Sequence, residues 1–95
     1  MAELLRSHLG TIGLREQRAE NAPPHDRYAV GVHHVAINGG SRRAVNRAAE
    51  WARERSVEIE SGPQEYAYQP GYYAVFFYDP DGLKLEIVHV PGLAA

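Results

Sequence analysis

The alternation of apolar and polar positions is weak over the first thirty residues of the chain. Residues 2–9 are compatible with a short helix that ends at Gly10, because glycine readily adopts the left-handed conformation of a helix stop. Residues 11–16 alternate as a short strand would. Two consecutive prolines within residues 20–27 are typical of a linker. We therefore expect residues 1–29 to be an N-terminal segment and linker.

Residues 30–91 are strongly patterned and predict the element order β-α-β-β-β. The helix follows Ser41, a favourable N-cap residue, and its inner stripe is mostly alanine, which allows close packing against a sheet. A tight turn at Asp79-Pro80-Asp81-Gly82 joins the last two strands. The strands are expected at residues 30–38, 57–60, 72–78 and 83–90, and the helix runs to about Arg55. The predicted fold class is α+β: a single βαβββ module with a mixed, curved sheet and one packing helix, preceded by a short helix/strand segment.

Strand parity predicts which side chains share a face of this sheet, because successive residues of a strand point to opposite sides. Val35 on the first strand and Leu85 on the last strand belong to large aliphatic faces, which are the natural receivers of the helix. His34 and Glu86 have the other parity. We therefore expect both of them on the face opposite the helix.

The strand over residues 72–78 is bulky on both parities, whereas a sheet with one solvated face alternates apolar and polar residues. The single helix can cover one face only, so the second face is expected to be covered by residues 1–30, by a second copy of the chain or by a ligand. The rings expected to line a ligand cavity there, with core packing as their alternative role, are Tyr72, Tyr73 and Phe76. Tyr66 and Tyr68 lie on the preceding loop and could form a lid.

The amino-acid composition of the chain excludes several functional classes. The chain has no cysteine, which excludes disulfide scaffolds and thiolate metal sites. Its net charge is -2, with no basic stripe of the kind that nucleic-acid surfaces carry. No apolar run approaches the roughly 20 residues of a membrane span, and the first residues lack the features of a signal peptide. We expect a cytoplasmic protein that binds neither nucleic acid nor membrane.

Two segments of the chain form a recognisable combination. One is Gly31-Val32-His33-His34-Val35-Ala36-Ile37, and the other runs from Gly71 to Val88 through the Asp-Pro-Asp-Gly turn. Together they resemble the second module of the glyoxalase/bleomycin resistance/extradiol dioxygenase superfamily, also called vicinal oxygen chelate proteins. In that superfamily, two βαβββ modules face each other and cup a divalent metal. The resemblance implies that His34 is the first-strand ligand and Glu86 the last-strand ligand. A plain hydrogen-bonding role within the sheet is the alternative for His34.

An imidazole and a carboxylate together suit Zn, Fe, Mn, Ni or Co. Two protein ligands are fewer than the three or four of a usual site. Residues 1–29 resemble the tail of a first module. A homodimer would supply the missing ligands, because it would bring a second His34 and a second Glu86 to the cavity. No catalytic general base is identifiable.

Three hypotheses therefore remain open at the level of the sequence. The first is a metal-dependent lyase, isomerase, dioxygenase or drug-modifying enzyme that acts on a small oxygen-rich substrate. The second is a metal-free module that binds an aromatic or planar, drug-type compound. The third is an accessory fragment that needs another chain.

Overall fold

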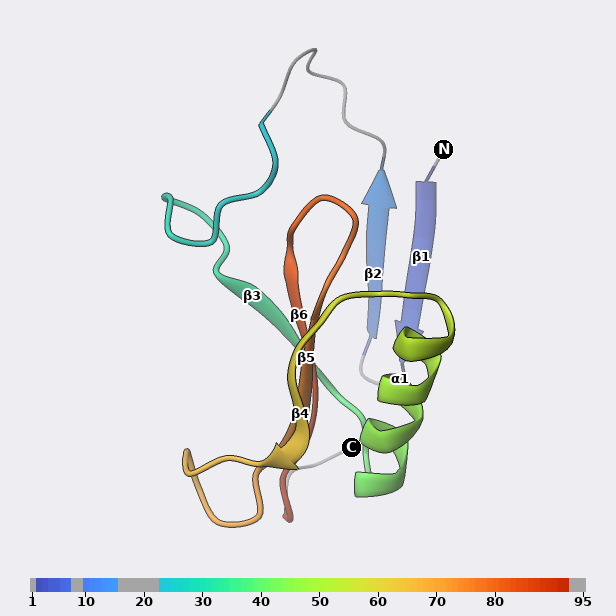
Figure 1. Cartoon of the computed structure of the whole chain (residues 1–95), viewed down its shortest axis with the longest axis vertical. Coiled ribbons are helices and arrows are strands. Elements are labelled where there is room, and N and C mark those ends of the chain that lie inside the picture. The colour runs from blue at the N-terminus through green and yellow to red at the C-terminus, as the bar shows by residue number, and fades with distance from the viewer. Residues whose placement is uncertain (1, 8–9, 16–22, 93–95) are drawn as a thin grey trace.

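The computed structural model describes residues 2–7, 10–15 and 23–92, which form a two-stranded hairpin and a βαβββ module (Figure 1). The predicted α+β fold class is confirmed. The elements are β1 (Ala2–Ser7), β2 (Gly10–Arg15), β3 (His34–Asn38), α1 (Arg42–Glu54), β4 (Ile59–Glu65), β5 (Tyr73–Tyr78) and β6 (Lys84–His89).

The module has a mixed four-stranded sheet in the order β3-β6-β5-β4. The first strand, β3, runs parallel to the last, β6, while β4, β5 and β6 are antiparallel neighbours. This order places Glu86 in the interior of the sheet, between Ala36 on β3 and Phe76 on β5.

Helix α1 covers one face of the sheet, as Figure 1 shows. Ser41 caps it as predicted, because its hydroxyl accepts a hydrogen bond from the backbone N–H of Ala44. Val45 and Ala49 on the helix pack against Val75 and Phe77 of β5. Each large apolar side chain buried in this way contributes about 1.5–3 kcal/mol relative to exposure. The predicted alanine-rich contact stripe is therefore confirmed.

We call the other face of the sheet the open face. It also carries a buried cluster, formed by Ala74, Phe76, Val88 and Val90. Tyr66 and Tyr72 pack against this cluster from the connection between β4 and β5. The module's own loop therefore covers part of this face, a source of cover that the sequence analysis did not include.

The N-terminal segment differs from the sequence prediction. The predicted helix over residues 2–9 is wrong, because residues 2–7 form strand β1 and pair antiparallel with β2. The predicted strand at residues 11–16 is confirmed as β2, which begins at Gly10. Pairing with β2 overrides the local helix preference of residues 2–7. The hairpin pairs with no strand of the module, and Figure 1 places it on the same side of the sheet as α1.

The bounds of β3 and β4 also differ from the prediction by more than one residue. β3 begins at His34 and not at residue 30, because residues 30–33 are irregular. β4 starts at Ile59 and extends to Glu65, beyond the predicted end at residue 60. It does so with shifts of register against β5. β4 is an edge strand, where bulges and proline are tolerated.

Candidate metal centre

His34 and Glu86 meet on the open face, as strand parity predicted. His34 is the first residue of β3, Glu86 lies in the middle of the adjacent strand β6, and His34 Nε2 is 3.1 Å from Glu86 Oε1. The His34 side chain is one third exposed. Glu86 is 1% exposed and is the buried charged residue of the described part of the chain. The pair therefore joins a solvent-accessible imidazole to a buried carboxylate.

Both oxygens of the Glu86 carboxylate have partners. Oε1 faces His34, and Oε2 accepts a hydrogen bond from the Tyr72 hydroxyl. Burial, followed by the hydrogen bond to Glu86, raises the pKa of Tyr72, which keeps the phenol protonated and able to donate. A buried carboxylate is tolerated when its oxygens are hydrogen-bonded in this way.

The other ring nitrogen of His34 contacts its neighbour in the sequence. His33 Nδ1 lies 2.8 Å from His34 Nδ1, so one of the two nitrogens carries the proton and the other accepts it. Desolvation and the nearby His34 lower the pKa of His33, which favours its neutral form. A His34 ring that binds a cation through Nε2 would therefore find an acceptor for its Nδ1–H in His33.

The geometry of the pair fits a divalent metal. Metal–ligand bonds of about 2.0–2.2 Å place two donors about 3.0–3.5 Å apart at octahedral to tetrahedral angles. Nε2 and Oε1 are 3.1 Å apart, within this range and also at the distance of an ordinary hydrogen bond. Imidazole nitrogen and carboxylate oxygen are also the donors that first-row divalent metals accept. Among residues 2–7, 10–15 and 23–92, no group of three or more potential ligands is found. In the described part, one chain thus offers one imidazole and one carboxylate at this place.

Comparison with known proteins agrees with the fold. The family described as "Glyoxalase/Bleomycin resistance protein/Dioxygenase superfamily" matches residues 9–87. The chain belongs to this superfamily. No curated protein matches the chain.

Two solved structures resemble this glyoxalase-superfamily chain. One is a protein from Bacillus halodurans that is provisionally called a glyoxalase, with 25% identity and a TM-score of 0.70 over 95% of this chain and 76% of that one. The other is a hypothetical protein from S. aureus, with 13% identity and a TM-score of 0.62 over 94% of this chain and 66% of that one. The second likeness supports the fold alone.

The three rings predicted to line a cavity are divided between the two faces. Phe76 and Tyr72 lie on the open face with Glu86, and Phe76 contacts the His34 ring edge to face, with their centroids 6.3 Å apart. Tyr73 lies on the helix side, where its hydroxyl donates to Asn46. The structure therefore brings two of the three predicted rings to the His34–Glu86 pair.

Aromatic rings continue from Phe76 toward the loop. Tyr66 contacts Phe76 edge to face at 5.2 Å and stacks on Tyr68 at 5.6 Å between centroids. Tyr68 in turn contacts Tyr72 at 5.0 Å. The predicted loop tyrosines thus form an aromatic rim at one end of the open face, and Tyr68 is largely exposed.

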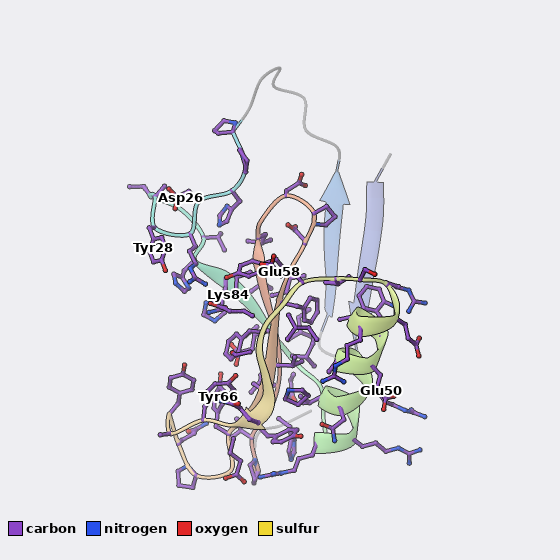
Figure 2. The ribbon with its side chains drawn as sticks, in the orientation of Figure 1. Asp26, Tyr28, Glu50, Glu58, Tyr66 and Lys84 are labelled. Atoms are coloured by element: carbon purple, nitrogen blue, oxygen red, sulfur yellow. The ribbon has the colours of Figure 1, made fainter. Side chains whose placement is uncertain are left out.

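A charged network at the opposite end of this face was missed by the sequence analysis. Glu60 binds Lys84 Nζ at 2.9 Å and Arg27 Nη1 at 3.1 Å, and Arg27 also donates to the Tyr78 hydroxyl. Parity could have placed Glu60, Tyr78 and Lys84 together, but no periodicity signals Arg27, which lies in an irregular segment. Figure 2 shows Tyr28 and Tyr66 at the two ends of the face, with Lys84 between them.

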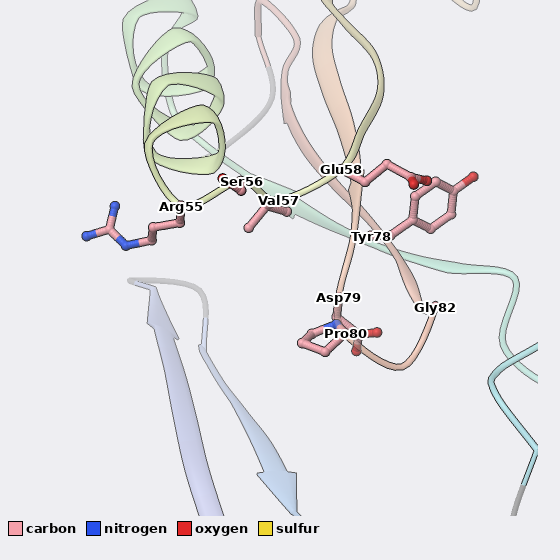
Figure 3. Close-up of a pocket in the computed structure, with 8 residues that line it drawn as sticks. All are labelled: Arg55, Ser56, Val57, Glu58, Tyr78, Asp79, Pro80 and Gly82. Atoms are coloured by element: carbon pink, nitrogen blue, oxygen red, sulfur yellow. The ribbon is translucent and has the colours of Figure 1, made fainter.

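A pocket of about 590 Å³ lies away from the ligand pair, between the end of α1 and the turn after β5 (Figure 3). Arg55, Glu58 and Asp79 are its charged lining residues. It contains neither His34 nor Glu86. Chemistry, and not cavity size, therefore identifies the candidate site.

The described helix, with 13 residues, is too short and too polar to cross a membrane.

Proposed function

We propose that the open face carries half of a divalent-metal site, and that two copies of the chain complete it in a homodimer. The observation that carries this proposal is the pairing of His34 Nε2 with Glu86 Oε1 at 3.1 Å, with the carboxylate buried and fixed. A buried charge on a sheet face destabilises a small domain unless it is well paired. Its presence beside an accessible imidazole therefore favours a role in binding.

His34 and Glu86 would hold the metal, and a second copy would add the same two residues. The resulting four ligands would match the number that protein metal sites normally use. When bound, such a metal acts as a Lewis acid toward oxygen atoms of a substrate. The aromatic rim and Phe76 would bind the apolar part of a small, oxygen-rich molecule. On this basis the protein is a metal-dependent lyase or dioxygenase of the glyoxalase superfamily.

The test combines the mass of the purified protein in solution with elemental metal analysis. A dimer that carries one metal for each pair of His34–Glu86 units, and that loses it in His34→Ala, is the expected result. His89→Ala is the matched control, because His89 on β6 lies opposite Tyr73 and therefore has the parity of the helix side, away from His34 and Glu86. A metal-free monomer would refute the proposal and favour an accessory fragment that needs another chain.

The aromatic rim favours a second candidate function, namely the binding of a planar aromatic compound without metal. The rings of Tyr66, Tyr68 and Tyr72 contact one another, and Tyr68 leaves most of its surface to solvent. Calorimetry with p-nitrophenol as the probe, in the presence of EDTA, tests this function. Tight binding that Tyr68→Ala abolishes would support it, whereas no binding by the metal-free protein would exclude it for this probe.

A further inference from the structure

We infer that Tyr72 is a positioning residue for the metal centre: its hydroxyl holds Glu86 Oε2 and leaves Oε1 to the metal. This inference rests on the function proposed above. The effect of Tyr72 would come through the orientation of the carboxylate.

The two oxygens of Glu86 have different surroundings, which is the first support for this role. The Tyr72 hydroxyl donates to Oε2, whereas Oε1 points to His34 Nε2. A carboxylate with one oxygen already engaged presents the other as a single donor at a defined place. Such outer partners of a ligand typically change metal affinity by about 10–100-fold when they are removed.

The backbone of Tyr72 is also fixed, which makes it a suitable support. Its N–H donates to the carbonyl of Gln69, and its own carbonyl accepts from the N–H of Tyr66. Its ring is held edge to face by Tyr68, with 5.0 Å between centroids. The hydroxyl can therefore hold Glu86 from an ordered loop, and the loss of this single group frees the carboxylate to rotate.

Tyr73 provides a matched control. It is the next residue, it is also a tyrosine, and its hydroxyl also makes one hydrogen bond, to Asn46 on the helix side of the sheet. Tyr72→Phe and Tyr73→Phe therefore delete the same atom from opposite faces. Both substitutions keep the ring and its packing.

The experiment measures Zn²⁺ affinity of the full chain by competition with a chromophoric chelator, together with the absorption spectrum of the Co²⁺-loaded protein. Tyr72→Phe is expected to weaken Zn²⁺ binding about 10–100-fold and to alter the Co²⁺ spectrum, because the coordination of Glu86 changes. Tyr73→Phe is expected to leave both readouts at their wild-type values.

Equal affinity and identical Co²⁺ spectra in wild type and Tyr72→Phe would overturn the positioning role while the metal site stands. A Tyr72→Phe protein that fails to fold would overturn it too, because the hydroxyl would then be a requirement of the fold. Wild-type protein that binds neither metal would instead overturn the proposed function, and this inference with it.

Discussion

Replacing Glu86 by glutamine separates a ligand role from a structural role for this buried carboxylate. Glutamine has the same shape, so no cavity forms, and its oxygen can still accept the hydrogen bond from Tyr72. Its amide N–H would face His34 Nε2, which can accept it when the ring proton moves to Nδ1, toward His33. Every hydrogen bond of the site can therefore be remade without the charge.

The expected change in the free energy of unfolding of Glu86→Gln is small. Hydrogen bonds to a charged group contribute about 1.5–3 kcal/mol and neutral ones about 0.5–1.5 kcal/mol, but the variant is also spared the cost of burying a charge. These effects oppose each other, and we expect a net change within about 1 kcal/mol. Glu86→Ala should differ, because a cavity costs on the order of 1 kcal/mol and the stranded Tyr72 hydroxyl about 1–3 kcal/mol.

Urea unfolding in EDTA, followed by circular dichroism, measures both variants. Wild type and Glu86→Gln are expected to have similar free energies of unfolding, and that of Glu86→Ala is expected to be lower by about 2–4 kcal/mol. Metal analysis of the same proteins, purified without EDTA, should find metal in wild type alone, because an amide is a much weaker ligand than a carboxylate for these metals. A Glu86→Gln protein as unstable as Glu86→Ala would refute the reasoning, since the charge would then be needed by the fold itself.

Two further predictions concern the fold around the site. Val75→Ala should lower the free energy of unfolding by about 2–3 kcal/mol, because two methyl groups are lost and a cavity forms at a fully buried position. The control Val30→Ala, at a fully exposed position, should change this free energy by less than about 0.5 kcal/mol in the same denaturation assay. Partial burial opposes ionisation of Glu60, but hydrogen bonds from Lys84 and Arg27 outweigh it and lower the pKa of Glu60. This contribution to stability is present above the ordinary glutamate pKa of about 4.3 and is lost as the pH falls through the lowered folded-state value. The stability gap between wild type and Glu60→Gln should therefore close on acidification, and a gap that stays constant from neutral to acidic pH would contradict this.

The central part of the site was predictable because it depends on strand parity alone. One assignment of β3 and β6 places His34 and Glu86 on the same face, whatever the exact ends of the strands are. The same rule could have separated Tyr72 from Tyr73, since consecutive residues of an extended chain point to opposite sides. Residue type alone favours one cavity for both rings, whereas strand parity separates them.

The parts that sequence reasoning missed depend on long-range contacts. Residues 2–7 are mostly good helix formers, and their pairing with β2 overrides this local preference. Arg27 reaches Glu60 from an irregular segment that no periodic pattern describes. Such contacts follow from the path of the chain through space, which local propensity does not fix.

The surroundings of Glu86 also restrict how a second copy could complete the site. Tyr72 occupies the side of Oε2, and Phe76 and Val88 belong to the buried cluster of the same face. His34 is one third exposed and belongs to β3, an edge strand of the module's sheet. In the proposed homodimer, the second pair of ligands would therefore have to approach Oε1 from the β3 side. Val32, just before this strand, is exposed in the single chain and is apolar surface that such an approach would bury.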